Sequence, residues 1–143
     1  MTVAAILKHK GDAVFAIAPT ALVAQLAALL AEKRIGAVLV RDTAGQVLGI
    51  VSERDIVRSL AMNGAHTLEM TAGQLMTRVI HTVTPRTTVR EAMEKMTLGR
   101  VRHLPVMEND TLLGLISIGD VVKARITQTE HEVDSLRAYV AGA

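Results

Sequence analysis

The segment GIVSERD at residues 49–55 recurs as GLISIGD at residues 114–120, sixty-five residues further along the chain. Both segments start with glycine and place an aspartate three residues after a serine. The preceding stretches also match, because AVLV at residues 37–40 aligns with HLPV at residues 103–106 at a distance of sixty-six residues. One residue is therefore missing from the second copy, in the turn between the aligned stretches. The same features in the same order indicate an internal duplication.

Each copy has the pattern of a strand, a helix, two strands and a second helix. Runs rich in β-branched residues flank a turn at residues 43–45, and apolar residues at helical spacing precede them. The pattern predicts an α/β (α+β) fold of two pseudo-symmetric βαββα repeats packed as a pair, with a short N-terminal and a longer C-terminal helix. The expected divisions are a first repeat at residues 7–62, a connector at 63–77, a second repeat at 78–127 and a helical tail at 128–143.

Local signals predict where the helices begin and end. In the first copy Thr20 is the expected N-cap, and Gly36 is expected to stop the helix. In the second copy Thr88 and Glu91 have the spacing of a capping box, and Gly99 is expected to end the helix.

The tail carries a narrow apolar stripe after a polar stretch. The stripe consists of Val133, Leu136, Tyr139 and Val140. An apolar stripe beyond the second repeat needs a partner. Two arrangements are open: the tail folds back on its own domain, or it pairs with another subunit.

Composition narrows the classes of function. Half of the 143 residues are hydrophobic, yet Phe15 and Tyr139 are the only aromatic ones, too few to bind single-stranded nucleic acid by stacking. The absence of cysteine excludes disulfides, zinc thiolates and thiol nucleophiles. The net charge is +2 and the basic residues are dispersed, whereas a DNA-binding face needs a dense basic stripe.

The sequence offers no signal for export or membrane insertion. The first residues lack a charged leader followed by an apolar run. The most apolar stretch, residues 21–31, is too short to span a bilayer. We therefore expect a cytoplasmic protein with neither a membrane nor a nucleic acid as partner.

The repeated motifs resemble those of tandem cystathionine-β-synthase-type (CBS) domains, the pair known as a Bateman module. The resemblance covers residues 7–126 and rests on Pro19 and Pro85, the RHLPV run at residues 102–106 and the two Gly-x-x-Ser-x-x-Asp segments. It implies a regulatory module of the bacterial stand-alone type that binds AMP, ADP, ATP, NAD or S-adenosylmethionine in a cleft between its repeats. It also implies a homodimer.

The repeated serine and aspartate suit a ribose phosphate. Ser52 and Ser117 stand where a strand passes into a helix, so their hydroxyls and the exposed N–H groups favour a phosphate. Asp55 and Asp120 follow one turn later and can accept hydrogen bonds from ribose hydroxyls, each worth roughly 1.5–3 kcal/mol. The alternative is ordinary capping, in which the serine caps the helix and the aspartate favours its first turn.

Basic residues near these two strand-to-helix corners, at Ser52 and Ser117, are candidate phosphate contacts. In the second copy the resemblance assigns this role to Arg102 and His103. The first copy has Gly36-Ala37 at the matching positions, so its candidates are Arg54 or Arg58, or residues reached from the other copy. We therefore expect two unequal sites, with a solvated surface pair as the alternative for Arg102 and His103.

An adenine ring would need apolar walls with polar backbone groups at its edge. The first strand of each copy and the start of the second copy's middle strand are suitably placed. The candidate residues are Val14, Ala16, Ile80, Thr82, Leu104 and Pro105. The alternative is that these residues pack the core.

Two other functions compete with nucleotide binding. Catalysis would need a base and its orienting partner, such as His103 with Asp120 or His81 with Ser117, but no spacing supports such a pair and no Walker-type loop or metal-ligand cluster occurs. We therefore expect no enzyme activity and no metal. The second rival is a ligand-free CBS-type interaction or scaffolding module. In the nucleotide-binding hypothesis, occupancy is transmitted to an unknown protein effector.

Overall fold

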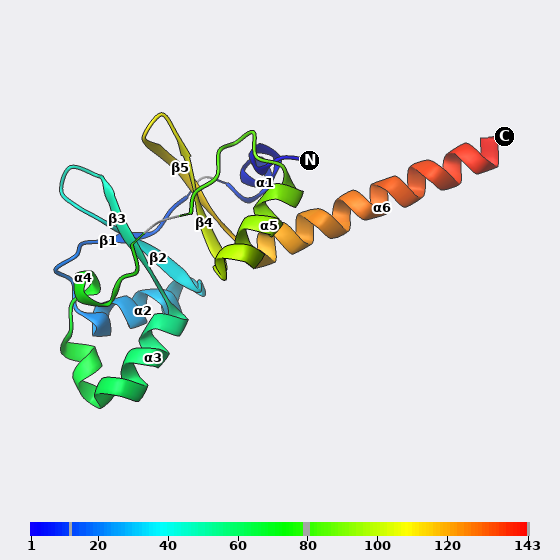
Figure 1. Ribbon diagram of the computed structural model, residues 1–143. Helices are drawn as coiled ribbons and strands as arrows, with labels where there is room; N and C mark the ends of the chain where they lie inside the picture. Colours follow the sequence, from blue (N-terminus) through cyan, green and yellow to red (C-terminus); the bar gives the residue numbers. More distant parts are fainter. Residues whose placement is uncertain (12, 79–80, 143) are drawn as a thin grey trace. The chain divides into compact units, whose positions relative to one another are not determined.

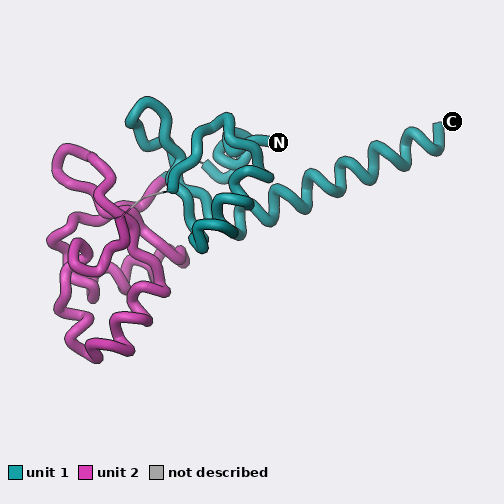
Figure 2. Tube along the Cα trace, viewed as in Figure 1, with its two compact units in different colours: residues 1–13, 81–143 teal, residues 14–80 magenta. Residues whose placement is uncertain are grey.

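The computed structural model describes residues 1–11, 13–78 and 81–142 (Figure 1). Its contacts divide the chain into two units, coloured separately in Figure 2. Unit 1 contains Met1–Ala13 and His81–Ala143, and unit 2 contains Val14–Ile80. The two copies therefore have separate cores, and the N-terminal residues belong to the unit that holds the second copy.

Unit 2 is built on a three-stranded sheet. Its strands are β1 (Ala16–Ile17), β2 (Ala37–Arg41) and β3 (Val47–Ser52), in the order β1-β2-β3, with β1 parallel and β3 antiparallel to β2. Its helices are α2 (Val23–Lys33), α3 (Glu53–Asn63), the 3-10 helix η1 (Gly64–Glu69) and α4 (Ala72–Leu75). Leu26 and Leu30, one turn apart on α2, are buried in the same cluster as Val38 and Val40, which alternate along β2. The expected βαββα order is confirmed in this unit.

Unit 1 repeats this plan around a two-stranded sheet. Its elements are α1 (Val3–Lys10), α5 (Val89–Gly99), β4 (His103–Glu108), β5 (Thr111–Ser117) and α6 (Ile118–Gly142), with β4 and β5 antiparallel. In the part of this copy that the structure describes, the first strand is represented by a bridge, in which Val83 pairs in parallel with Val106. Leu104 and Ile116 are fully buried in the core of the unit, together with Val3 of α1.

The residue missing from the second copy lies in the hairpin turn. In unit 2 the turn closes with the N–H of Asp42 donating to the carbonyl of Gln46 (3.0 Å), and Gly45 supplies a φ of 83°. In unit 1 the turn consists of Asn109 and Asp110, whose φ angles are 50° and 61°. Tight two-residue hairpin turns need positive φ at both central positions, which Asn and Asp tolerate. The one-residue gap between the two copies is thus explained by a difference in turn type.

The first glycine of each repeated segment lies where another segment passes close by. A Cβ on Gly49 would lie 2.7 Å from the carbonyl oxygen of Thr77, and a Cβ on Gly114 would lie 2.6 Å from Cδ2 of Leu7. Thr77 forms a backbone bridge with Ile50, whereas Leu7 belongs to α1. Glycine at this repeated position therefore allows α1 to pack on β5 of unit 1. Leu7, the first residue of the expected first repeat, thus contacts the second copy.

The start of α2 differs from the expectation. Its N-cap is Leu22, not Thr20, and the N–H of Leu22 donates to Oε1 of Gln25 (3.0 Å). Thr20 instead lies in a turn that precedes the helix, and Leu22 is held by a backbone bridge with Thr71. A tertiary contact therefore sets the helix start, so the prediction of Thr20 was wrong.

Helices α2 and α5 end in the same way. Arg34 and Arg100 cap α2 and α5 in the left-handed conformation, with φ of 54° and 52°. A stop at Gly36 would let α2 run to Ile35, but the helix ends two residues earlier, at Lys33. Gly99 is confirmed as the last residue of α5. At the start of α5 the Thr88 hydroxyl oxygen accepts from the N–H of Glu91 (3.1 Å), as the spacing predicts.

The C-terminal helix α6 is a single element of 25 residues. Its first turns pack on the core of unit 1 through Val121 and Ala124. From Thr129 to Gly142 every residue is exposed, and the ribbon continues beyond the rest of unit 1 (Figure 1). Of the helices in the described part of the chain, none has the length and apolar composition to cross a membrane.

Candidate functional site

Ser117 and Asp120 form a closed corner where β5 passes into α6. Oδ2 of Asp120 accepts hydrogen bonds from the N–H of Ser117 (2.8 Å) and from its hydroxyl (3.0 Å). The N–H of Asp120 donates back to Oγ of Ser117 (3.2 Å). Reciprocal bonds of this kind satisfy N–H groups at the start of a helix. The capping alternative is therefore observed at this corner.

The same corner occurs in unit 2. Oδ2 of Asp55 accepts from the N–H and the hydroxyl of Ser52 at 2.8 and 3.0 Å, and the N–H of Asp55 donates to Oγ of Ser52 (3.4 Å). Oδ1 of Asp55 accepts from the Thr77 hydroxyl (3.4 Å). Arg54, a candidate phosphate contact of this copy, directly precedes Asp55 on α3 and is exposed. The duplication thus preserves the geometry of the corner as well as its residues.

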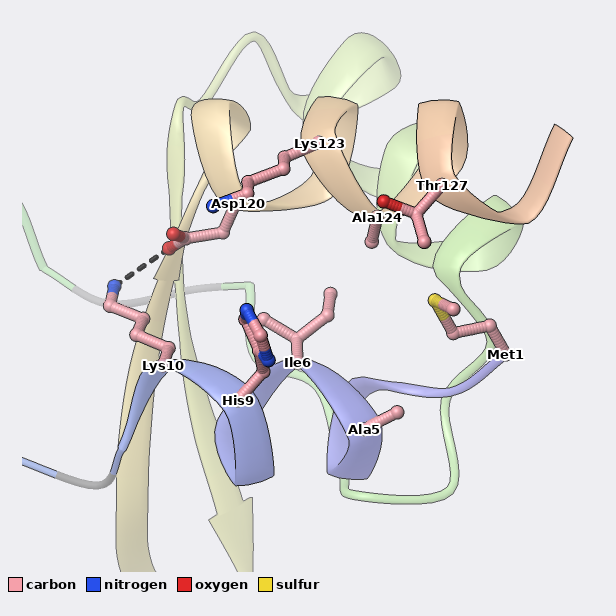
Figure 3. A pocket seen from close by; sticks show the side chains of 9 residues that line it. All are labelled: Met1, Ala5, Ile6, His9, Lys10, Asp120, Lys123, Ala124 and Thr127. Atoms are coloured by element: carbon pink, nitrogen blue, oxygen red, sulfur yellow. Dashed lines mark hydrogen bonds and ion pairs between the residues drawn. The ribbon is translucent and has the colours of Figure 1, made fainter. Parts of the chain in front are cut away.

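Lys10 distinguishes the corner of unit 1 from that of unit 2. Its Nζ donates to Oδ2 of Asp120 (2.7 Å) and to the carbonyl of Leu115 (2.8 Å). Figure 3 shows this ion pair bridging α1 and α6. Sequence reasoning missed Lys10, because it precedes Asp120 by 110 residues and stands in a basic group, Lys8 to Lys10, typical of solvated surface.

The environment keeps Asp120 ionised. Burial alone would raise the pKa of its carboxyl, but hydrogen bonds from Lys10 and Ser117 and the charge of Lys10 together lower it below its usual value. Ser117 and Lys10 both direct their donors at Oδ2. Within the described residues no donor reaches Oδ1, so one oxygen of a charged carboxylate remains available to a ligand hydroxyl.

His103 and Arg102 lie at the same corner. His103 pairs with Ser117 in the β4–β5 register, and the carbonyl of Arg102 accepts from the N–H of Ile118 (2.8 Å). Burial lowers the pKa of His103 below its usual value; the charge of Lys10 lowers it further, Asp120 opposes this in part, and Arg102 adds a small lowering effect. His103 is therefore neutral at neutral pH. In that state it offers a phosphate an N–H donor and no positive charge.

The pKa of His103 predicts how stability depends on pH. As the pH falls through about 6.5, the unfolded chain binds a proton at this imidazole, whereas the folded chain binds it only at a lower pH. The unfolded state then holds more protons, so the free energy of unfolding should decrease as the pH falls below neutrality. We expect His103→Gln to flatten this decrease when urea unfolding is measured between neutral pH and about pH 5.

His131→Gln is the matched control, because His131 lies on the exposed part of α6. This control should keep the pH dependence of the parent protein. Equal slopes for His103→Gln and the parent protein would contradict the assigned role of His103.

A pocket of about 490 Å³ lies beside the corner of unit 1, between α1 and α6 (Figure 3). Its size is within the range of small-molecule sites. It is lined by Met1, Ala5, Ile6, His9, Lys10, Asp120, Lys123, Ala124 and Thr127. Ile6 and Ala124 contribute apolar walls, while Lys10, Lys123 and Asp120 contribute charge.

The expected adenine residues do not gather at this pocket. Leu104 is fully buried in the core, so its side chain has no exposed surface to offer a ligand, and Pro105 is also buried. Thr82 is half-buried, and its carbonyl accepts from Nζ of Lys95 (2.7 Å). Val14 is half-buried and Ala16 is exposed, both in unit 2. Ile80 lies outside the described residues.

The duplicated fold and its repeated corners define a tandem-repeat α/β module, and comparison with known proteins identifies the family. The CBS domain family matches residues 10–62 and 72–127, one match in each copy. The chain therefore belongs to the CBS-domain family and carries two repeats, as the sequence resemblance predicted.

Individual relatives agree with this assignment. The crystal structure of the CBS-domain containing protein ATU1752 from Agrobacterium tumefaciens has 43% identity and a TM-score of 0.85, covering 87% of this chain and 99% of that one. A Burkholderia ambifaria protein, described as a candidate signal-transduction protein with CBS domains, has 38% identity and a TM-score of 0.83, covering 89% and 95%.

Two further relatives bear on function. A CBS domain protein from Pyrobaculum aerophilum was solved in complex with AMP; it has 27% identity and a TM-score of 0.73, covering 84% of this chain and 89% of its own. The mitochondrial CBS domain-containing protein CBSX3 of Arabidopsis thaliana is 36% identical over 117 residues, which are 79% of this chain. The match spans only 57% of the length of CBSX3.

Proposed function

We propose that this chain is a regulatory module that binds an adenine nucleotide (AMP, ADP, ATP or NAD) at its serine–aspartate corners and transmits occupancy to a partner protein. The observation that carries the proposal is the corner of unit 1, where an ionised Asp120 with an available oxygen stands beside Lys10 at the edge of a pocket. The AMP bound to the Pyrobaculum aerophilum relative supports the choice of ligand.

The residues of the corner suit the parts of a ribose phosphate. Asp120 would accept hydrogen bonds from the ribose hydroxyls through Oδ1, at a helix N-terminus that favours anions. Arg102, which is exposed, and Lys10 would neutralise the phosphate, and neutral His103 would add a donor. The hydroxyl of Ser117 would donate to the phosphate after turning away from Oδ2 of Asp120. The ring would lie against the half-buried Thr82, with the buried Leu104 and Pro105 contributing only support from the core.

The corner of unit 2 is the weaker site in this proposal. Asp55 and Ser52 would hold the ribose and phosphate there, and the exposed Arg54 would supply the cation. Val14 and Ala16 of the first strand would contact the ring. The Asp55 carboxylate has no lysine beside it comparable to Lys10 within the described residues, so the two sites should differ in affinity.

A second candidate is a ligand-free interaction module. It is favoured by the observation that Asp120 and Asp55 already accept hydrogen bonds from their own helix starts, and that Lys10 already pairs with Asp120. In such a module the corners would serve only to cap α3 and α6.

Titration of the purified chain with AMP, ADP, ATP and NAD distinguishes the two candidates. A nucleotide that binds the folded state should add roughly 2.7 kcal/mol to the free energy of unfolding at 100 times its Kd. Calorimetry should give saturable heats for the same nucleotide. Absence of both effects across the panel would reject nucleotide binding and leave the ligand-free module.

A further inference from the structure

The exposed face of α6 has the pattern of a two-stranded coiled coil. Apolar residues and one threonine recur at alternating intervals of four and three residues: Val122, Ile126, Thr129, Val133, Leu136 and Val140. This is a heptad repeat, and its length along the helix is about 27 Å. The apolar members are between 42% and 66% exposed, so the seam faces away from the core of unit 1.

The residue types at the heptad positions favour two strands. The a positions hold the β-branched residues Ile126, Val133 and Val140, and the d position between the last two holds Leu136. β-branched residues at a with leucine at d favour parallel dimers. Val122 and Thr129 hold the other two d positions. Thr129 donates its hydroxyl to the carbonyl of Arg125 (2.9 Å), so burial of the seam would leave no unpaired hydroxyl there.

The charges beside the seam select the partner and its direction. In a parallel pair, each g residue faces the e residue five positions later on the partner helix. The g residues Arg125 and Glu132 would then face Glu130 and Arg137 of a second copy, and both pairs have opposite charges. None of these four side chains forms an ion pair within the part of the chain that the structure describes.

We propose that two copies of this chain associate through a parallel, in-register coiled coil of their α6 helices. The seam would bury apolar side chains that are otherwise exposed, and the four flanking charges would become two attractive pairs on each side of a twofold axis. A seam of fewer than three full heptads gives a modest affinity. The fraction of dimer should therefore rise with the concentration of the full-length protein.

Sedimentation of the full chain over a range of concentrations tests the association. The parent protein should form dimers, and Leu136→Asp should weaken dimerisation by at least about tenfold, because it places two carboxylates in the seam. Thermal unfolding of the same variant controls for the fold, since residue 136 lies beyond the core of unit 1. A parent protein that is monomeric at all concentrations, or a folded Leu136→Asp variant that dimerises as well as the parent, would overturn the proposal.

Charge reversal and cross-linking test the direction of the helices. Glu132→Arg should weaken the dimer, and adding Arg137→Glu should restore it, because the reversed pair is again attractive. The chain has no cysteine, so Val140→Cys introduces a single thiol that can form a disulfide with its own copy only when the helices are parallel and in register. Asp134→Cys, on the outer face, is the control and should not cross-link. A dimer in which Val140→Cys fails to cross-link would overturn the parallel arrangement.

Discussion

Replacing Asp120 with alanine should weaken nucleotide binding by about tenfold or more, because the loss of 1.4 kcal/mol already produces that change. A ribose hydroxyl that donates to an ionised carboxylate forms a charge-assisted bond worth roughly 1.5–3 kcal/mol. Asp120 is ionised, is held in place by Ser117 and Lys10, and lines the pocket of unit 1. The alanine removes the acceptor and leaves a ribose without its partner. Calorimetric titration with the best nucleotide of the panel measures the change.

The same substitution also removes a helix cap, so its effect on folding has to be measured separately. The cost of losing such a cap is about 0.5–2 kcal/mol of unfolding free energy. Asp134→Ala is the matched control, because Asp134 lies on the same helix but on its exposed part. The control should bind nucleotide as the parent does. If Asp120→Ala is folded and binds with unchanged affinity, Asp120 does not belong to the site.

The sequence predicted the features that depend on neighbours in the chain. The strand and helix order and the serine–aspartate corners were predictable because each rests on residues within one repeat. The duplication was predictable because both copies carry these features in the same order. Capping of the helix by Ser117, with Asp120 in its first turn, was also among the alternatives, since both residues lie at one helix start. What local patterns could not distinguish was whether the aspartate caps a helix, binds a ligand or does both.

Features that depend on distant contacts were missed. Lys10 reaches Asp120 because α1 packs on unit 1, and nothing in the order of the repeats places that helix with the second copy. The start of α2 at Leu22 likewise depends on a bridge to Thr71. Loop closure over such separations leaves no periodic signal in the sequence.

The middle strand of the second copy shows a further limit of pattern analysis. Leu104, Pro105 and Val106 are consecutive and all buried, so β4 lacks the alternation that would separate an inner from an outer face. Sequence reasoning placed Leu104 and Pro105 at a ligand. In the structure the side chain of Leu104 belongs to the hydrophobic core, where its role is measurable through stability.

Leu104→Ala should lower the free energy of unfolding by about 2–5 kcal/mol, the range found when a buried leucine leaves a cavity. Leu104 is fully buried in the cluster that joins α1, β4, β5 and α6. Rigid neighbours on several elements limit collapse of the cavity, so the upper part of that range is expected. Urea unfolding followed by circular dichroism measures the change.

Leu98→Ala is the matched control, because Leu98 is 86% exposed on α5 of the same unit. Truncation of an exposed side chain changes stability by less than about 0.5 kcal/mol. The two variants remove the same atoms, so the difference between them measures burial alone. A loss at Leu104 no larger than that at Leu98 would mean that the core does not depend on this side chain, and a role facing a ligand would again have to be considered.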